Sequence, residues 1–267
     1  MPHFVANLTM LWPELKPYDR FRAAADAGFR EVEMLFVHEL DARQIERLLS
    51  QLGLRMVLFD PAAGNWNAGE RGLMCLPGRE GEYVREAQVA VDLARRFGTE
   101  QINILAGIPP TSASVELIER TALANLLRAA ELADNHGVEV LVENINEVDV
   151  PGYWLGTIAK AAGLVKASRH PRVRLQFDQY HASVAGEDPV RCFHEHIDLI
   201  GHVQIADAPG RHQPGTGLAP IATFLDSLDQ GGYTRFVGLE YKPLGSTAES
   251  LEWMKNYSDR HAAGPDQ

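Results

Sequence analysis

The stretch VEVLVENIN, residues 138–146, runs through apolar and β-prone positions and then ends on a carboxylate, Glu143, before an asparagine-rich turn. Two interpretations fit a strand of this kind. In the first, the strand simply stops where the chain meets water. In the second, Glu143 stands at the carboxyl end of a barrel strand, where barrel enzymes place their catalytic groups. The second interpretation requires that other strands end in the same way.

The same alternation of a short β-rich run and a longer amphipathic segment repeats along the whole chain. Strands are predicted over residues 4–8, 31–35, 55–59, 101–105, 138–143, 173–178, 202–206 and 236–240. Helices are predicted between them, among others over residues 18–27, 41–52, 80–97 and 116–136, each followed by a glycine that can end a helix. Eight such units predict an α/β fold, a single (β/α)8 TIM barrel domain over residues 1–267. The alternative, an open doubly wound sheet, lacks its usual glycine-rich dinucleotide motif here.

Composition and charge narrow the classes of partner. The net charge of −11 argues against nucleic acid, because phosphate backbones are bound by clusters of lysine and arginine. No apolar run approaches the roughly 20 residues that cross a bilayer, so no membrane partner is expected. Two cysteines are too few for a disulfide framework, which favours a cytoplasmic location. A homo-oligomer is left open, because barrels often associate through their outer helices.

Four predicted strands end in side chains with oxygen ligands: Glu143, Asp178, Gln204 and Glu240. Any one acid at a strand end is more often a solvated residue or a helix cap than a ligand. Carboxylates that converge on one barrel mouth repel each other, however, and such a cluster persists if a cation lies among them. An all-oxygen set suits one hard divalent ion, Mg²⁺ or Mn²⁺, better than zinc. Glu33 and Asn103 are further polar residues on strands of the same barrel.

These residues also carry a resemblance. Glu143, Asp178 followed by His181, Gln204 and Glu240 resemble the pattern of the metal-dependent sugar isomerases and epimerases, a superfamily that includes xylose isomerase and endonuclease IV. The segments FVANLTML, AGERGLMCLPGREGE, DQYH, HVQIAD, PGTG and GLEYKP are similar to the hydroxypyruvate isomerase family over nearly the whole chain. The resemblance implies one metal ion bound by Glu143, Asp178, Gln204 and Glu240, with the two glutamates as the catalytic acid/base pair. Ketose epimerases typically have histidine at the position of Gln204, which favours the branch that acts on small hydroxy acids.

The resemblance implies interconversion of hydroxypyruvate and tartronate semialdehyde. This reaction removes a proton beside a carbonyl group and passes through an enediolate, which a divalent ion stabilises. Glu143 and Glu240 come from the fifth and eighth strands, so one can take the proton while the other returns it. Alternative substrates are 2-oxo-tetronate, which has one more carbon, or a ketose that is epimerised. Two other classes are a phosphodiester hydrolase of the endonuclease IV type, which would need histidine-rich zinc sites, and a barrel that binds a sugar acid without converting it.

A small hydroxy-keto acid substrate needs a cation for its carboxylate. Four candidates fall in predicted loops on the active face: Arg71, Arg79, Arg211 and Lys242. Trp66 lies in the same long loop as Arg71, residues 60–81, and is expected to close over the site. His181 is expected to hydrogen-bond the substrate or to orient a metal ligand. A role in surface charge or packing fits each of these residues about as well, so all of them are candidates.

Overall fold

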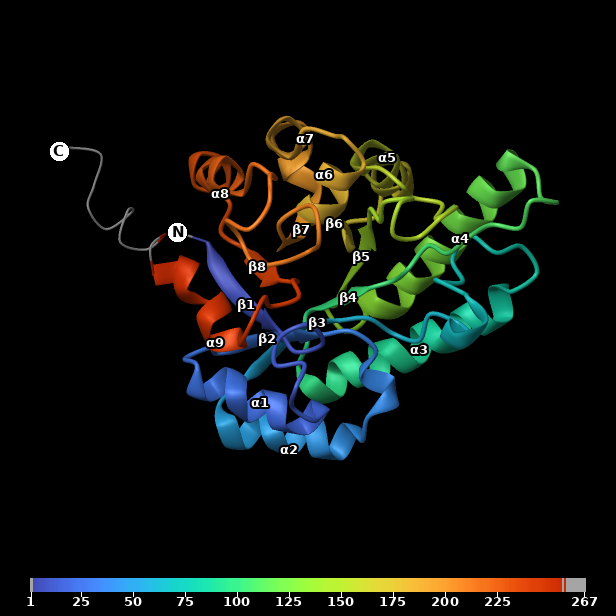
Figure 1. Ribbon diagram of the computed structural model, residues 1–267. Coiled ribbons are helices and arrows are strands. Elements are labelled where there is room, and N and C mark those ends of the chain that lie inside the picture. Colours follow the sequence, from blue (N-terminus) through green and yellow to red (C-terminus); the bar gives the residue numbers. More distant parts are fainter. Residues whose placement is uncertain (1, 256, 258–267) are drawn as a thin grey trace.

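The computed structural model describes residues 2–255 and 257, and it contains a closed barrel of eight parallel strands in the order β1 to β8 (Figure 1). The strands are β1 (His3–Asn7), β2 (Glu31–Met34), β3 (Arg55–Phe59), β4 (Gln101–Asn103), β5 (Glu139–Glu143), β6 (Val173–Asp178), β7 (Ile200–Ile205) and β8 (Phe236–Leu239). β8 pairs with β1 and so closes the ring. The predicted (β/α)8 TIM barrel is therefore confirmed, and the open doubly wound sheet is excluded. The predicted single domain over residues 1–267 extends beyond the described residues.

Helices cover the outside of the barrel (Figure 1). They are α1 (Pro17–Asp26), α2 (Ala42–Leu52), α3 (Glu80–Phe97), α4 (Val115–Asp134), α5 (Ile158–Ser168), α6 (Gln179–Val184), α7 (Pro189–His196), α8 (Ile221–Gln230) and α9 (Thr247–Ser250). Short 3-10 turns η1 (Val37–Glu39), η2 (Trp66–Ala68) and η3 (Ile197–Leu199) lie in the connections. None of the helices within the described residues is long and apolar enough to span a membrane.

Capping residues in the sequence mark several of the helix ends. The carboxylate of Asp41 accepts hydrogen bonds from the first turn of α2, and Gly53 ends that helix with φ of 63°. Gly98 ends α3 in the same left-handed conformation, with φ of 67°. Such a conformation is costly for residues with a Cβ atom, so glycine fixes both helix ends. The predicted bounds of α3 are matched residue for residue.

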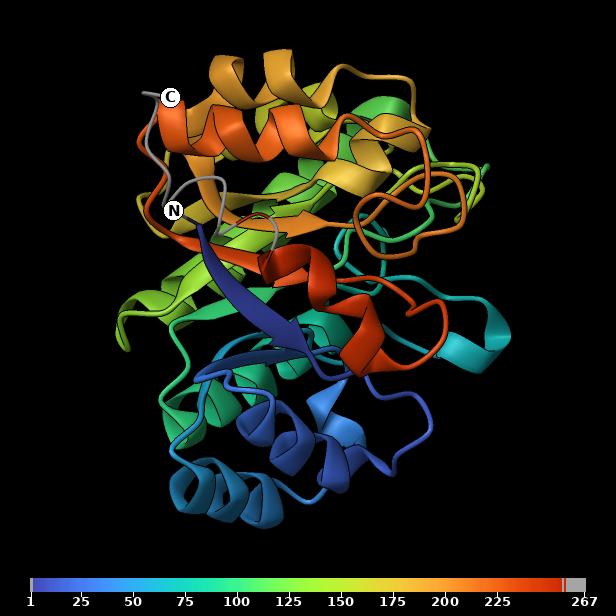
Figure 2. The ribbon, with the colours of Figure 1, turned by 60° about the vertical axis from the view of Figure 1, so that its left-hand side comes forward.

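β4 is two residues shorter than predicted, because the chain after it pairs with the long β3–α3 loop. Ala106 forms an isolated antiparallel bridge with Gly72, and its carbonyl accepts a hydrogen bond from the amide of Cys75 at 2.8 Å. Figure 2 shows this long loop projecting from the barrel on the same side as the loop between β7 and α8. Loops from distant parts of the sequence therefore surround one end of the barrel, the carboxyl end of the strands.

The barrel interior is apolar only in a thin layer. Val5, Val57, Leu58 and Leu141 form a small buried cluster with Phe236 packed against it, whereas the main apolar core lies between the strands and the helices. Polar side chains occupy both ends of the interior. The hydrogen-bond and ion-pair partners of these side chains differ between the two ends. This difference distinguishes the candidate active site from the opposite end of the barrel.

Candidate active site at the carboxyl end of the barrel

Glu143 is the last residue of β5, and its side chain is buried. Asn103, at the end of neighbouring β4, donates a hydrogen bond from Nδ2 to Oε2 of Glu143 at 2.7 Å. Burial raises the pKa of Glu143 well above its ordinary value, and repulsion from Glu240 and Asp178 raises it further. A raised pKa moves this carboxyl group toward the range in which an acid/base catalyst works.

Asp178 ends β6 and also caps the amino end of α6. Its Oδ1 accepts a hydrogen bond from the backbone amide of His181 at 2.9 Å. The side chain of Asn144 bonds to both the backbone amide and the carbonyl of Asp178, which fixes the strand end. Burial raises the pKa of Asp178 to about 6, although the charge of Arg211 opposes the shift. The strand end and the helix cap together hold one carboxylate oxygen, Oδ2, toward the mouth residues.

His181 lies one helical turn after Asp178 and is buried. Its Nδ1 faces two donors, the backbone amide and the Nδ2 of Asn146, at 3.3 and 2.5 Å. Its Nε2 lies 3.6 Å from Oδ2 of Asp178. Burial lowers the pKa of His181 well below its ordinary value, and nearby Arg211 lowers it further, so the ring is neutral. Ligand atoms of Glu143, Asp178 and His181 lie within 4.8 Å of one another, a spacing that could hold a divalent metal ion.

Glu240 follows β8 and forms an ion pair with Arg211 of the β7–α8 loop. Nη2 of Arg211 donates hydrogen bonds to Oε1 of Glu240 at 2.5 Å and to Oδ2 of Asp178 at 3.3 Å. The guanidinium also lies over the ring of Tyr180, 5.0 Å from its centroid. The other oxygen of Glu240, Oε2, is buried without a hydrogen-bond partner among the described residues. Burial raises the pKa of Glu240 well above its ordinary value despite the opposing charge of Arg211.

Asp60 is a fourth carboxyl group at this end that the sequence analysis missed. It directly follows β3 and is buried, and its Oδ1 has no hydrogen-bond partner among the described residues. Burial raises its pKa to about 8, a hydrogen bond with Asn103 opposes the shift, and the charge of Glu33 adds to it. Asp60 directly follows an apolar strand, a signal similar to that of Glu143 at the end of β5, but it is also the first residue of the long loop.

Gln204 lies on β7, as predicted, and the structure places it opposite Asp178 on β6, but its hydrogen bonds lead into the barrel interior. Its Nε2 donates to Oε1 of Glu33 at 3.0 Å, and its Oε1 accepts a bond from Nε2 of Gln176 at 2.6 Å. The sequence does not predict these hydrogen bonds among Glu33, Gln176 and Gln204. The role of Gln204 as a metal ligand stays a prediction.

The loop that carries Arg211 folds around the carboxylate of Asp207. This carboxylate accepts hydrogen bonds from five backbone amides, those of Ala208, Gly215, Thr216, Gly217 and Ala219, at 2.8–3.0 Å. Gly217 is required at its position, because a Cβ atom there would meet the carbonyl oxygen of Ala208 and Oδ1 of Asp207. Arg211, in the left-handed conformation with φ of 58°, projects from this loop into the mouth. The PGTG segment thus encloses an internal carboxylate.

Trp66 and Arg71 form a stack at the edge of the long loop. The guanidinium carbon of Arg71 lies 3.9 Å from the centroid of the Trp66 ring, and Trp66 packs against Phe36 with ring centroids 4.8 Å apart. Nη1 of Arg71 donates to the backbone carbonyls of Trp66 and Glu70. Trp66 is 42% exposed. Its expected closure over the site stays a prediction.

The structure separates the four candidate cations by their partners. Arg79 is bound by the carboxylates of Glu70 and Glu82, at 2.7 and 2.6 Å. Lys242 is exposed. Among these four described residues, only Arg211 is in contact with the acids of the mouth. Arg211 is therefore the candidate that the geometry favours for a substrate carboxylate.

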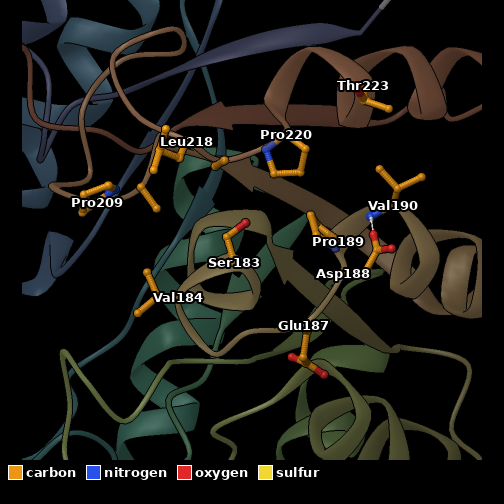
Figure 3. Close-up of a pocket in the computed structure, with 12 residues that line it drawn as sticks. Ser183, Val184, Glu187, Asp188, Pro189, Val190, Pro209, Leu218, Pro220 and Thr223 are labelled. Atoms are coloured by element: carbon orange, nitrogen blue, oxygen red, sulfur yellow. Dashed lines mark hydrogen bonds between the residues drawn. The ribbon is translucent and has the colours of Figure 1, made fainter.

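A cavity of about 760 Å³ lies beside the mouth, between α6, the start of α7 and the β7–α8 loop (Figure 3). Ser183 and Val184 of α6 line one side, and Pro209 and Leu218 of the loop line another. None of the four buried carboxyl groups lines this cavity, which is mainly apolar. The four buried carboxyl groups lie in the mouth itself, which is therefore the candidate active site.

A closed barrel of eight parallel strands, with buried carboxyl groups gathered at the carboxyl ends of its strands, defines the class: a (β/α)8-barrel enzyme with an acidic active site. Residues 21–257 match the family model described as xylose isomerase-like TIM barrel. The chain belongs to this family, and within it to the group of hydroxypyruvate and 2-oxo-tetronate isomerases. It is therefore an isomerase.

Individual relatives agree over nearly their full length. A 2-oxo-tetronate isomerase from Cupriavidus necator is 39% identical over 97% of this chain and 100% of its own. A hydroxypyruvate isomerase from Escherichia coli is 36% identical over 96% of this chain and 100% of its own. A crystal structure titled AP endonuclease, family 2, from Brucella melitensis superposes with a TM-score of 0.93 at 37% identity, covering 96% of this chain and 99% of that one. The resemblance seen in the sequence motifs is thus confirmed.

Proposed function

We propose that this isomerase interconverts hydroxypyruvate and 2-hydroxy-3-oxopropanoate (tartronate semialdehyde) through an enediolate. The observation that carries the proposal is the arrangement of Glu143 and Glu240, two buried carboxyl groups with raised pKa values on β5 and after β8. These two strands are not neighbours in the ring, since β6 and β7 lie between them. A substrate in the mouth would therefore meet one carboxyl group on each side.

The donor set of the mouth suits one hard divalent ion, Mg²⁺ or Mn²⁺. We propose that Glu143, Asp178, Gln204 and Glu240 hold it. The buried Oε2 of Glu240 has no partner among the described residues, and a buried carboxylate oxygen of this kind calls for a cation or a proton. When bound, the ion would act as a Lewis acid that stabilises negative charge on the oxygens of the enediolate.

The two glutamates carry the protons. One carboxylate removes a proton from C3 of hydroxypyruvate, and the electron pair of that C–H bond forms the C2–C3 double bond of the enediolate. The electron pair of the C2 carbonyl bond moves onto O2 at the same time. The other carboxyl group then gives a proton to C2, the proton on O3 passes to O2, and O3 becomes the carbonyl oxygen of the product. Burial raises the pKa of both Glu143 and Glu240, which moves each carboxyl group toward the range that suits a general acid/base.

Arg211 and His181 are proposed to bind and orient the substrate. A guanidinium group can bind a carboxylate through two parallel hydrogen bonds, and Arg211 is already directed at the acids of the mouth. Both donors of Asn146 face Nδ1 of His181, so the neutral ring carries its proton on Nε2. We therefore favour His181 as a hydrogen-bond donor to a substrate oxygen over His181 as a metal ligand.

A second candidate substrate is 2-oxo-tetronate, because the Cupriavidus necator relative that is 39% identical carries that name. Both acids have a hydroxyl group on the carbon next to a 2-oxo group, so the same proton transfers convert either one. They differ by one carbon with its hydroxyl group, and such a difference is decided by a few contacts in the pocket. The mechanism is the same for both acids.

We place the reaction in the reducing cytoplasm. Cys75 and Cys192 are both free and buried. Burial raises the pKa of Cys75 to about 12 and that of Cys192 to about 11, so neither thiol is reactive at neutral pH. These properties support a protein that uses no disulfide and no cysteine chemistry.

The experiment that tests the proposal is turnover of the Mn²⁺-loaded protein on hydroxypyruvate and, separately, on 2-oxo-tetronate. Glu143→Gln and Glu240→Gln are measured in parallel. Conversion of hydroxypyruvate that both substitutions abolish is the expected result. Conversion of the four-carbon acid alone would keep the mechanism and replace the substrate. Several bound zinc ions and no turnover of either acid would instead support the phosphodiester hydrolase.

A further inference from the structure

A hydrogen-bonded network inside the barrel holds the amide of Gln204 at both ends. Oε1 of Glu33 accepts hydrogen bonds from Nδ2 of Asn7 at 2.8 Å and from Nε2 of Gln204 at 3.0 Å. Oε2 of Glu33 lies 2.7 Å from Nε2 of His202. On the other side, Nε2 of Gln176 donates to Oε1 of Gln204 at 2.6 Å. All five residues are buried.

The carboxylate of Glu33 decides which way this amide faces. A glutamine side chain can present either an oxygen or an NH₂ group, and only the first can bind a cation. Oε1 of Glu33 accepts a hydrogen bond from Nδ2 of Asn7 and a second from Gln204, so the NH₂ group of Gln204 is the one that faces Glu33. A reversed amide would bring two acceptor oxygens to about the same 3.0 Å separation without a proton between them. The side-chain amide of Gln176 can donate or accept a hydrogen bond, so its orientation adapts to the orientation of Gln204 that Glu33 sets.

The position of Glu33 depends in turn on a missing side chain. Gly238 on β8 is opposite Gln204 on β7. A Cβ atom built on Gly238 would meet both carboxylate oxygens of Glu33. The absence of a side chain at this point lets the carboxylate extend from β2 across the barrel to β7. This close approach is the reason that the strand needs glycine here.

We infer that Glu33 is a positioning residue for the metal site: it fixes the amide of Gln204 so that the oxygen, rather than the NH₂ group, is available to a divalent ion. This inference rests on the proposed function, in which Gln204 is a ligand. Glu33 itself has no assigned ligand role. Partners that orient a metal ligand typically change metal affinity by 10- to 100-fold when they are removed.

The first test is the affinity of the metal-free protein for Mn²⁺, measured by the electron paramagnetic resonance signal of the free ion. Glu33→Gln keeps the shape of the side chain but introduces an NH₂ donor at this position, so that the amide of Gln204 can reverse. We expect the dissociation constant for Mn²⁺ to rise by about tenfold. The thermal midpoint of the metal-free variant is measured alongside, because a purely structural role would change the midpoint and leave the affinity of the folded protein unchanged.

A double-mutant cycle with Gln204→Ala tests whether Glu33 acts through Gln204. Adding Glu33→Gln to Gln204→Ala should produce no further loss of Mn²⁺ affinity. The exchanged pair Glu33→Gln with Gln204→Glu is the rescue variant, because a carboxylate at position 204 presents an oxygen in either orientation. We expect this variant to bind Mn²⁺ more tightly than Glu33→Gln alone. If Glu33→Gln does not fold, Gly238→Ala displaces the same carboxylate from the other side and should weaken Mn²⁺ binding similarly.

The outcomes separate this inference from the proposed function. Wild-type affinity in Glu33→Gln, together with weak binding in Gln204→Ala, would overturn the positioning role and leave the metal site intact. Wild-type affinity in both variants would overturn the positioning role together with Gln204 as a ligand. No binding of Mn²⁺ by the wild type would overturn the metal site of the proposed function itself.

Discussion

β5 carries a glutamate at each end, and the two side chains have opposite surroundings. Glu139, at the amino end, accepts hydrogen bonds from Arg235 at 2.6 and 3.0 Å and from Gln101 at 2.9 Å. Burial alone would raise its pKa, but these partners hold the pKa below its ordinary value. Glu143, at the carboxyl end, receives a bond from neutral Asn103 and faces other carboxyl groups, and its pKa is raised. One strand therefore carries two glutamates whose pKa values shift in opposite directions, and the difference lies in their partners.

The largest expected effect is on turnover and should be confined to one end of β5. Glu143→Gln should lower kcat by about 1000-fold, because a general acid/base contributes about 10²- to 10⁴-fold. Glu139→Gln is the matched control, with the same chemical change on the same strand, and should keep kcat within about twofold. Steady-state kinetics on whichever acid the wild type converts would measure both. Equal losses in the two variants would show that the ends do not differ in function.

The second effect is stabilisation by the metal ion. Mn²⁺ at about 100 times its dissociation constant should raise the free energy of unfolding of the wild type by about 2.7 kcal/mol, because it binds only the folded protein. Glu143→Gln should lose most of this gain, and Glu139→Gln should retain it. Thermal unfolding with and without Mn²⁺, after treatment with a chelator, measures the difference. An equal gain in all three proteins would place the ion elsewhere.

A smaller effect is expected from the ion pair at the amino end. Arg235→Ala should lower the free energy of unfolding by about 2 kcal/mol, because it leaves a half-buried carboxylate without its main partner. The cost is less than for a fully buried pair, since Arg235 is 38% exposed and solvent screens part of the interaction. Urea unfolding would measure the change. An unchanged midpoint would show that this pair contributes nothing to stability.

The smallest effect, counted per pH unit, concerns the pH dependence of stability. The pKa of Asp60 is about 8 in the folded protein and about 3.9 in an unfolded chain, so unfolding releases its proton between these values. Stability from this group is full below pH 4 and is lost as the pH rises toward 8. Asp60→Asn should therefore make the decline of stability between pH 6 and pH 8 shallower in the metal-free protein, by less than about 1.4 kcal/mol per pH unit.

At the amino end of β5, the contribution of Glu139 to stability should change with pH in the opposite direction. The folded-state pKa of Glu139 is lowered, so its stabilisation is full above its unfolded pKa of about 4.3 and is lost as the pH falls through the folded value. Glu139→Gln should leave the decline between pH 6 and pH 8 unchanged. Thermal midpoints across this range for the wild type and both variants would decide. A steeper decline in Asp60→Asn would contradict the assignment of its pKa.

The fold and three of the mouth carboxyl groups could be predicted because they depend on local pattern. Each of the eight strands was expected within two residues of its observed bounds, and Glu143, Asp178 and Glu240 follow from where strands end. Asp60 was missed because it lies where β3 ends and the long loop begins. Local pattern does not distinguish a site residue from a loop residue at such a position. Pattern alone gives the place of a residue along a strand, and hence its level in the barrel.

The contacts of Gln204 and Arg211 could not be predicted, because they depend on long-range packing. Gln204 bonds to Glu33, which is 171 residues away, and the register of both strands shifts by one residue near these positions. Arg211 was one of four equal candidates, and its selection depends on a left-handed backbone conformation and on how the loop folds around Asp207. Neither feature has a signature in the sequence.

Backbone hydrogen bonds to Asp207 hold the β7–α8 loop in place, and this makes the loop a suitable target for protein engineering. The carboxylate is bound by backbone amides, including those of Ala208 and Ala219 near the two ends of the loop, and every residue except proline supplies such a group. The anchoring thus depends little on the exposed side chains of the loop. Leu218, which is 90% exposed, can be varied while the ends of the loop keep their place on the barrel, whereas Arg211 is kept for its contacts with Asp178 and Glu240.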